Sequence, residues 1–131
     1  MQKLATLCCA LLLSSSFAVP VLAANPVKTD MKAMSQSLRA AANADDAAAM
    51  KASLTKLREY SVHAKTQVPP DFKDQPADGP ERKAYVEGLD KLIQQIDATI
   101  GLLDAGKLDE AKAALDGMAQ TKMEYHKKLK A

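Results

Sequence analysis

Apolar side chains recur at spacings of three and four residues along most of the chain that follows Pro26. This spacing places them on one side of an α-helix, so it predicts amphipathic helices rather than strands. The pattern covers four segments, at residues 27–42, 46–66, 80–105 and 108–129. The third segment has the clearest apolar stripe, which consists of Tyr85, Leu89, Leu92, Ile96, Ile100 and Leu103.

The residues between these segments are those that begin and end helices. They are Pro26 before the first segment, Asp45 and Asp46 before the second, Pro69 and Pro70 after it, and Gly106 after the third. Proline suits a first helical turn, and an Asp side chain can cap the exposed N–H groups. A proline pair stops a helix, and glycine favours a helix C-cap. The boundaries therefore agree with the periodicity, and residues 67–80 form a stiff, proline-rich loop.

Long helices joined by short connections predict an all-α protein, an up-down-up-down four-helix bundle. The composition agrees, because alanine is abundant and 47% of the residues are hydrophobic. Charged residues make up 26% of the chain, which is typical of a folded domain rather than a disordered one. The length of 131 residues predicts one domain with room for a short appended segment.

The first 23 residues have the pattern of a secretory signal peptide. Lys3 supplies a positive start, and Leu4 to Leu13 form an apolar run too short to span a bilayer. Small residues follow, and we expect cleavage after Ala23, with Ala24 as the neighbouring alternative. A short N-terminal membrane anchor is the other interpretation. Cleavage leaves one domain at residues 24–131. The signal peptide predicts export to the periplasm of a Gram-negative cell.

Cleavage would also remove the chemistry that cysteine could supply. The two cysteines, Cys8 and Cys9, both lie in the predicted signal peptide, so the exported chain has neither disulfide nor thiolate. It has no C-x-x-C-H motif, which excludes covalent attachment of a c-type haem. The net charge of +2 falls by one when Lys3 leaves, which argues against a nucleic-acid partner. We expect no stable membrane insertion of the mature protein.

Two side chains at one end of the predicted bundle could hold a metal cofactor. The first helix begins where the fourth helix ends, so Met31 and His126 lie on apolar stripes at the same end. A thioether facing an imidazole can ligate the iron of a porphyrin axially. The alternative is ordinary packing, because methionine commonly fills cores. His63 lies off the stripe of its helix, which favours a surface position.

No catalytic constellation accompanies this pair. The chain lacks a nucleophile elbow, a glycine-rich phosphate loop and a His-x-x-x-His zinc pair, so we expect that it is not an enzyme.

Short motifs in the same order along the whole chain resemble the soluble cytochrome b562 family. They are Leu54-Thr55-Lys56-Leu57-Arg58, Pro69-Pro70, Gly79-Pro80-Glu81, Gln95-Ile96-Asp97, Gly106-Lys107, Glu110-Ala111 and Tyr125-His126-x-Lys128. No single motif is specific, whereas the ordered set together with a signal peptide is.

The resemblance implies an electron-transfer protein that carries one non-covalent haem b per chain. Its axial iron ligands map onto Met31 and His126. Residues that contact the cofactor in the family map onto Met34, Pro69, Pro70, Tyr85, Leu89 and Lys122. Two of these differ from the family pattern, since Leu89 replaces an aromatic ring and Lys122 replaces an arginine, which removes the fork geometry suited to a propionate. We further expect a monomer that meets unidentified redox partner proteins in the periplasm. The alternative is a haem-free periplasmic bundle that acts as an adaptor, chaperone or stress protein.

Overall fold

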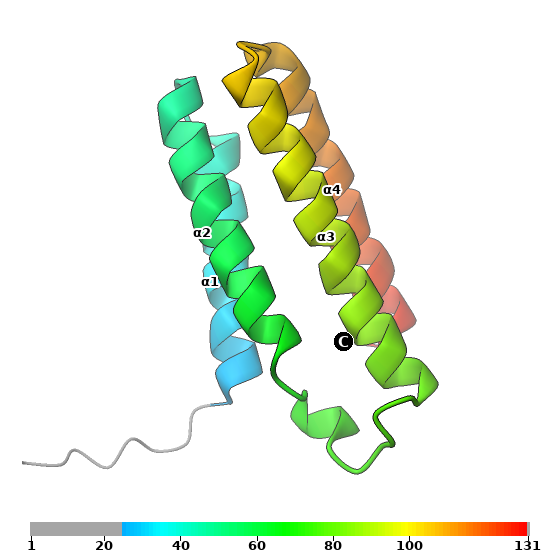
Figure 1. The fold of residues 1–131 in the computed structure, drawn as a ribbon. Helices are drawn as coiled ribbons and strands as arrows, with labels where there is room; N and C mark the ends of the chain where they lie inside the picture. The colour runs from blue at the N-terminus through cyan, green and yellow to red at the C-terminus, as the bar shows by residue number, and fades with distance from the viewer. Residues whose placement is uncertain (1–24, 131) are drawn as a thin grey trace, which may run out of the picture.

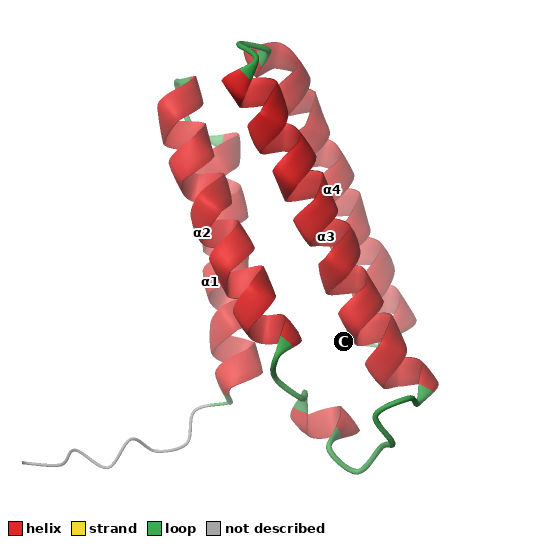
Figure 2. Cartoon of the chain, viewed as in Figure 1, coloured by secondary structure: helices red, strands yellow, loops and turns green. Residues whose placement is uncertain are grey.

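The computed structural model describes residues 25–130 and confirms the four-helix bundle. The helices are α1 (Pro26–Ala42), α2 (Ala47–Lys65), α3 (Pro80–Asp104) and α4 (Leu108–Lys128), each antiparallel to the next (Figure 1). Helices and loops account for all the described residues (Figure 2). The predicted signal peptide, residues 1–23, lies outside the described residues. Within 25–130, none of the helices combines the length and the hydropathy that crossing a bilayer requires.

The helix ends follow the local chemistry that the sequence indicates. Asp46 caps α2, where its side chain accepts a hydrogen bond from the backbone N–H of Ala49 at 2.7 Å. Gly106 adopts a φ of 76° after α3, and the N–H of Lys107 donates to the carbonyl of Leu102 at 2.8 Å. This Schellman turn lets α4 begin at once. The proline-rich loop contains one short helix, η1 (Pro70–Phe72), which the sequence pattern does not predict.

The core of the bundle is narrow and contains several small or polar side chains. The largest side chains that are completely enclosed are Met50, Leu54, Leu57, Ile96 and Met118. Ser61 and Thr99 are also buried, and each hydroxyl donates to the backbone carbonyl four residues earlier. Their polar groups are therefore satisfied within the helix, so they do not need a partner across the core.

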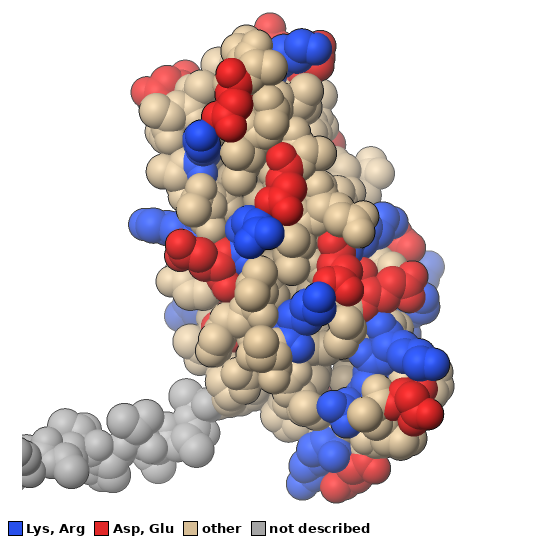
Figure 3. All heavy atoms as spheres, in the orientation of Figure 1, with Lys and Arg blue, Asp and Glu red and all other residues tan. Residues whose placement is uncertain are grey.

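Opposite charges join α2 to α3 at regular intervals. The ion pairs are Lys51–Asp104, Arg58–Asp97 and Lys65–Asp90. On each helix the paired residues are seven positions apart, which is two helical turns. Figure 3 views this face of the molecule, and blue and red side chains alternate along it. Because the pairs are exposed, each one adds little stability, but their regular spacing matches the register of the two helices.

Candidate functional site

The bundle has a crevice at the end where α1 begins and α4 ends. All four helices contribute to it, through Met31, Met34, Ser35, Leu38, Leu57, Tyr85, Gly88, Leu89, Leu92, Met118, Thr121, Lys122, Tyr125, His126 and Leu129. Its cavity volume is about 90 Å³, so the crevice is shallow in this structure. The lining is largely apolar, as the linings of cofactor sites usually are.

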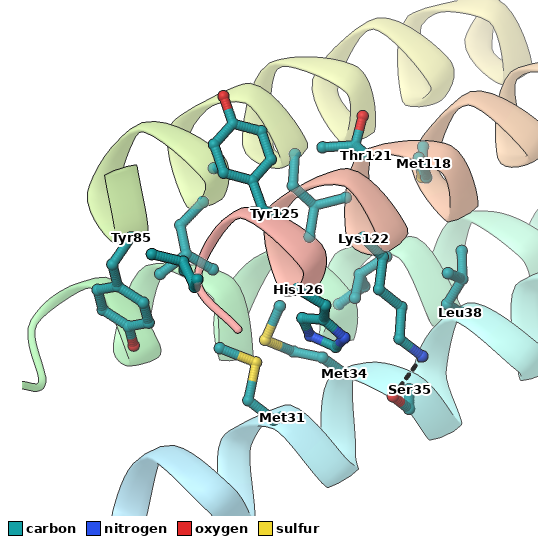
Figure 4. A pocket seen from close by; sticks show the side chains of 15 residues that line it. Met31, Met34, Ser35, Leu38, Tyr85, Met118, Thr121, Lys122, Tyr125 and His126 are labelled. Atoms are coloured by element: carbon teal, nitrogen blue, oxygen red, sulfur yellow. Dashed lines mark hydrogen bonds between the residues drawn. The ribbon is translucent and has the colours of Figure 1, made fainter. Parts of the chain in front are cut away.

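The predicted ligand pair meets in this crevice. Met31 and Met34 extend from α1, and His126 extends toward them from α4 (Figure 4). Met31 and His126 are each partly buried, whereas Met34 is 8% exposed. A soft sulfur and an imidazole therefore approach the same space from two facing helices. The sequence prediction that these two residues lie together is confirmed.

The surroundings of His126 favour its neutral form. Burial lowers the pKa of the imidazole below its usual value of 6.5, and the positive charge of Lys122 lowers this pKa further. A neutral imidazole offers a lone pair to a metal, whereas a protonated one does not. His126 is thus held in the state that can act as a ligand near neutral pH.

The titration of His126 can be followed directly. In the haem-free chain we expect its ring protons to titrate with a midpoint below 6.5, measured by NMR between pH 4.5 and 8. Lys122→Gln should move the midpoint part of the way back up, because it removes the smaller of the two causes and leaves burial in place. A His126 midpoint above that of a model peptide would contradict the expectation.

Lys122 spans the gap between α4 and α1. Its ammonium group donates a hydrogen bond to the hydroxyl of Ser35 at 3.0 Å (Figure 4). The side chain is otherwise exposed. Lys122 therefore places a positive charge at the mouth of the crevice, beside His126.

Of the other residues predicted to contact the cofactor, some line the crevice and others do not. Tyr85 and Leu89 line the crevice and are buried. The hydroxyl of Tyr85 donates to the carbonyl of Ala64 on α2 at 2.6 Å, so the ring alone faces the crevice. Burial, together with the nearby Asp30 carboxylate, raises the pKa of Tyr85 to about 12, which keeps its proton in place. Pro69 and Pro70 are not among the lining residues and lie in the loop after α2.

A buried acid beside the crevice is absent from the sequence predictions. Asp30 precedes Met31 and is 5% exposed, and its carboxylate lies 2.6 Å from Nδ1 of His63 on α2. His63 is exposed, as predicted, but it also ties α2 to α1 at the end that carries the crevice. The periodic pattern could not reveal this pair, because the two residues are 33 positions apart.

Removing His63 should test how much this pair stabilises the bundle. His63→Ala leaves a buried carboxylate without its partner, so we expect the free energy of unfolding to fall by about 1 kcal/mol. Denaturation in urea at pH 7, monitored by circular dichroism, measures the change. The double variant Asp30→Asn/His63→Ala should recover part of the loss, and no recovery would show that the pair is not the cause.

Tyr125, which precedes His126, is fixed by a close contact with α3. A Cβ atom at Gly88 would lie only 2.6 Å from Cδ1 of this ring, so the ring occupies the space that a side chain would need. The hydroxyl donates to the Glu87 carboxylate at 3.2 Å, and the ammonium groups of Lys91 and Lys128 lie 5.9 and 5.4 Å from the ring centre. Tyr125 therefore anchors the turn of α4 that carries His126. Gly88, a glycine inside a predicted helix, is the only sequence feature that could have indicated this contact.

Comparison with known proteins agrees with this geometry. A model of the cytochrome b562 family matches residues 26–130, which are nearly all the described residues. The chain belongs to the cytochrome b562 family. Proteins of this family carry a b-type haem and transfer electrons, which makes haem binding and electron transfer the function class for this chain.

Two relatives from Yersinia pestis extend the match. The "Probable soluble cytochrome b562 2" is 38% identical over 125 residues, which cover 95% of this chain and 94% of the relative. The "Probable soluble cytochrome b562 1" is 29% identical over 100 residues, which cover 76% of this chain and 79% of the relative. The match to the first relative spans nearly the full length of both chains.

Proposed function

We propose that this protein is a periplasmic electron carrier that holds one haem b without covalent attachment, between Met31 of α1 and His126 of α4. The observation that carries the proposal is the convergence of these two side chains in one apolar crevice, from opposite ends of the chain. Imidazole and thioether are a recognised pair of axial ligands for haem iron. The donor set thus fits the cofactor that the family implies.

The residues around the crevice suit the same cofactor. The haem would supply an iron that alternates between two oxidation states. Met34, Leu89 and Met118 present apolar surface to a planar, apolar ring. Lys122 provides a cation at the mouth, where a propionate can reach it, although it lacks the two parallel N–H donors of an arginine.

The ligand pair favours electron transfer over catalysis. If Met31 and His126 both held the iron, no coordination position would be left for a substrate. A thioether also raises the reduction potential relative to a second imidazole. Met31 and His126 are both partly exposed, so the crevice lies near the surface, where a partner can approach. The protein is therefore proposed to act as a carrier and not as an enzyme.

The periplasmic location rests on residues 1–23. Expression of the full chain in a Gram-negative host should release a protein into the periplasm whose mass corresponds to a chain that begins at Ala24. Intact-mass spectrometry distinguishes this start from Asn25, which would follow cleavage after Ala24. A protein that keeps its first 23 residues and stays with the membrane fraction would support the alternative of an N-terminal anchor.

A titration with haemin tests the cofactor. The purified chain should bind one equivalent and, after reduction, show the sharp visible bands of low-spin haem iron. Apomyoglobin serves as a competitor that measures the affinity. A chain that stays colourless with haemin would overturn the proposal and favour the haem-free adaptor or chaperone.

A further inference from the structure

Two of the seams of the bundle, α2–α3 and α1–α4, carry different charges. Along α2 and α3, acids and bases alternate and form ion pairs. Within residues 25–130, no ion pair joins α1 to α4, and these two helices contact each other only sparsely. Their one polar link is the hydrogen bond from Lys122 to Ser35. All the lining residues of the crevice that are not buried lie on α1 or on α4 and its C-cap, so the crevice opens along the seam between these two helices.

Both sides of this seam are basic. Lys28, Lys32 and Arg39 are exposed on α1, and their spacing places them on the same side of the helix as Ser35. The sole acid of α1 is Asp30, which is buried and paired with His63 of α2. The seam is therefore positively charged on the α1 side.

The α4 side continues this charge. Lys122 and Lys127 are exposed there, and the nearby Glu124 is paired with Lys91 of α3. The remaining acids of α4 are Asp109 and Glu110 in its first turn, at the opposite end of the bundle, and Asp116 near its middle. Arg39 lies in the last turn of α1, also away from the crevice. We call the four cations nearer the crevice, Lys28, Lys32, Lys122 and Lys127, the basic rim. Like charges that face one another across a seam do not stabilise it, so apart from the Lys122–Ser35 hydrogen bond the rim adds nothing to the packing of α1 against α4.

An exposed apolar side chain lies within the basic rim. Met123 is 72% exposed, the largest exposure of any large hydrophobic residue in the described chain. It follows Lys122 directly and lies one helical turn before Lys127. A protein interface commonly combines an apolar contact of this kind with a charged border.

From this arrangement we propose that the basic rim with Met123 is a docking surface for an acidic patch on a partner protein. The proposal rests on the proposed function in that the partner is a redox partner, which must approach the mouth of the crevice. Charge complementarity would steer the partner to this seam, because the α2–α3 face has its charges already paired. Opposed positive charges on α1 and α4 would then be neutralised by the partner's carboxylates.

Two other sources of negative charge explain the rim less well. Propionates of a bound haem would balance at most two of the four cations. An anionic membrane usually needs several apolar side chains for insertion in addition to charge, and Met123 is a single one. The basic rim therefore suits a protein surface better than either of these.

Binding of charged probe proteins tests the docking surface. The haem-loaded, isotope-labelled chain is titrated by NMR with a flavodoxin of net negative charge and with a c-type cytochrome of net positive charge, at about 10 mM ionic strength, where screening is weak. We expect the flavodoxin to bind, with shifts centred on the basic rim and Met123. The double variant Lys28→Glu/Lys32→Glu should weaken this binding at least about tenfold.

A matched variant controls for net charge. Lys56→Glu/Lys83→Glu changes the same total charge at exposed positions on α2 and α3, and it should alter the affinity less than about threefold. Equal loss in both variants, shifts outside the rim, or no binding of the flavodoxin would overturn the proposal. Binding to phosphatidylglycerol vesicles without binding to the flavodoxin would instead assign the rim to a membrane.

The two proposals can fail separately. A chain that takes up no haemin refutes the proposed function, and the same binding assay then runs on the haem-free chain. If the chain shows the low-spin spectrum but the Lys28→Glu/Lys32→Glu variant binds the flavodoxin as well as the unaltered chain does, only the docking surface is refuted.

Discussion

His126→Ala should lower the affinity for haem by roughly 100-fold or more and remove the low-spin spectrum. The expectation follows from ligand loss, since even partners of a metal ligand cost about 10- to 100-fold when they are removed. His126 is held neutral by burial and by Lys122, so near pH 7 it needs no deprotonation before it binds iron. Haemin titration against apomyoglobin gives the affinity, and the reduced visible spectrum gives the spin state.

Matched variants separate ligation from packing. His63→Ala removes the other histidine and should leave the spectrum low-spin. Met31→Leu and Met34→Leu each replace a thioether by a side chain of similar volume, so both largely keep the packing. Only Met31→Leu should change the spectrum and lower the reduction potential. If Met34→Leu had that effect instead, the axial methionine would be Met34.

The sequence predicts the fold well because its local rules agree with one another. Apolar spacing, the cap at Asp46 and the turn at Gly106 all indicate the same four helices, and short connections leave few alternative arrangements. The topology then brings Met31 and His126 to one end without any long-range information. This is why the central part of the site was predictable and why the crevice contains both residues.

The contacts that support the site depend on tertiary structure. Asp30 looks like an ordinary polar residue, and only the packing of α1 against α2 shows that it is buried against His63.

The ion pairs between α2 and α3, in contrast, leave a signal in the sequence. The spacing by seven of Lys51, Arg58 and Lys65 is visible there, as is that of Asp90, Asp97 and Asp104. The ion pairs between the two series could have been inferred, because both series repeat every seven residues and antiparallel helices bring such repeats opposite one another.

Two glycines of α3 should respond in opposite ways to the same substitution. Gly101 has no atom within 4 Å of an added Cβ, so Gly101→Ala should stabilise the protein by about 0.5–1 kcal/mol, because alanine loses less backbone entropy in a helix. An added Cβ at Gly88 would lie 2.6 and 2.7 Å from Cδ1 and Cγ of Tyr125. We expect Gly88→Ala to destabilise by about 1–3 kcal/mol, as overpacking does.

The effect at Gly88 should also reach the candidate ligand. Cγ lies close to the backbone, so the ring of Tyr125 cannot avoid a new methyl group by rotation alone, and the turn of α4 has to move. His126 is the next residue and moves with it. Urea denaturation of the haem-free variants measures the stability difference, and the reduction potential of the haem-loaded variants reports the displacement of His126. If Gly88→Ala matched Gly101→Ala in stability and left the potential unchanged, Tyr125 would not position His126; a stability loss without a change in potential would limit the contact to packing.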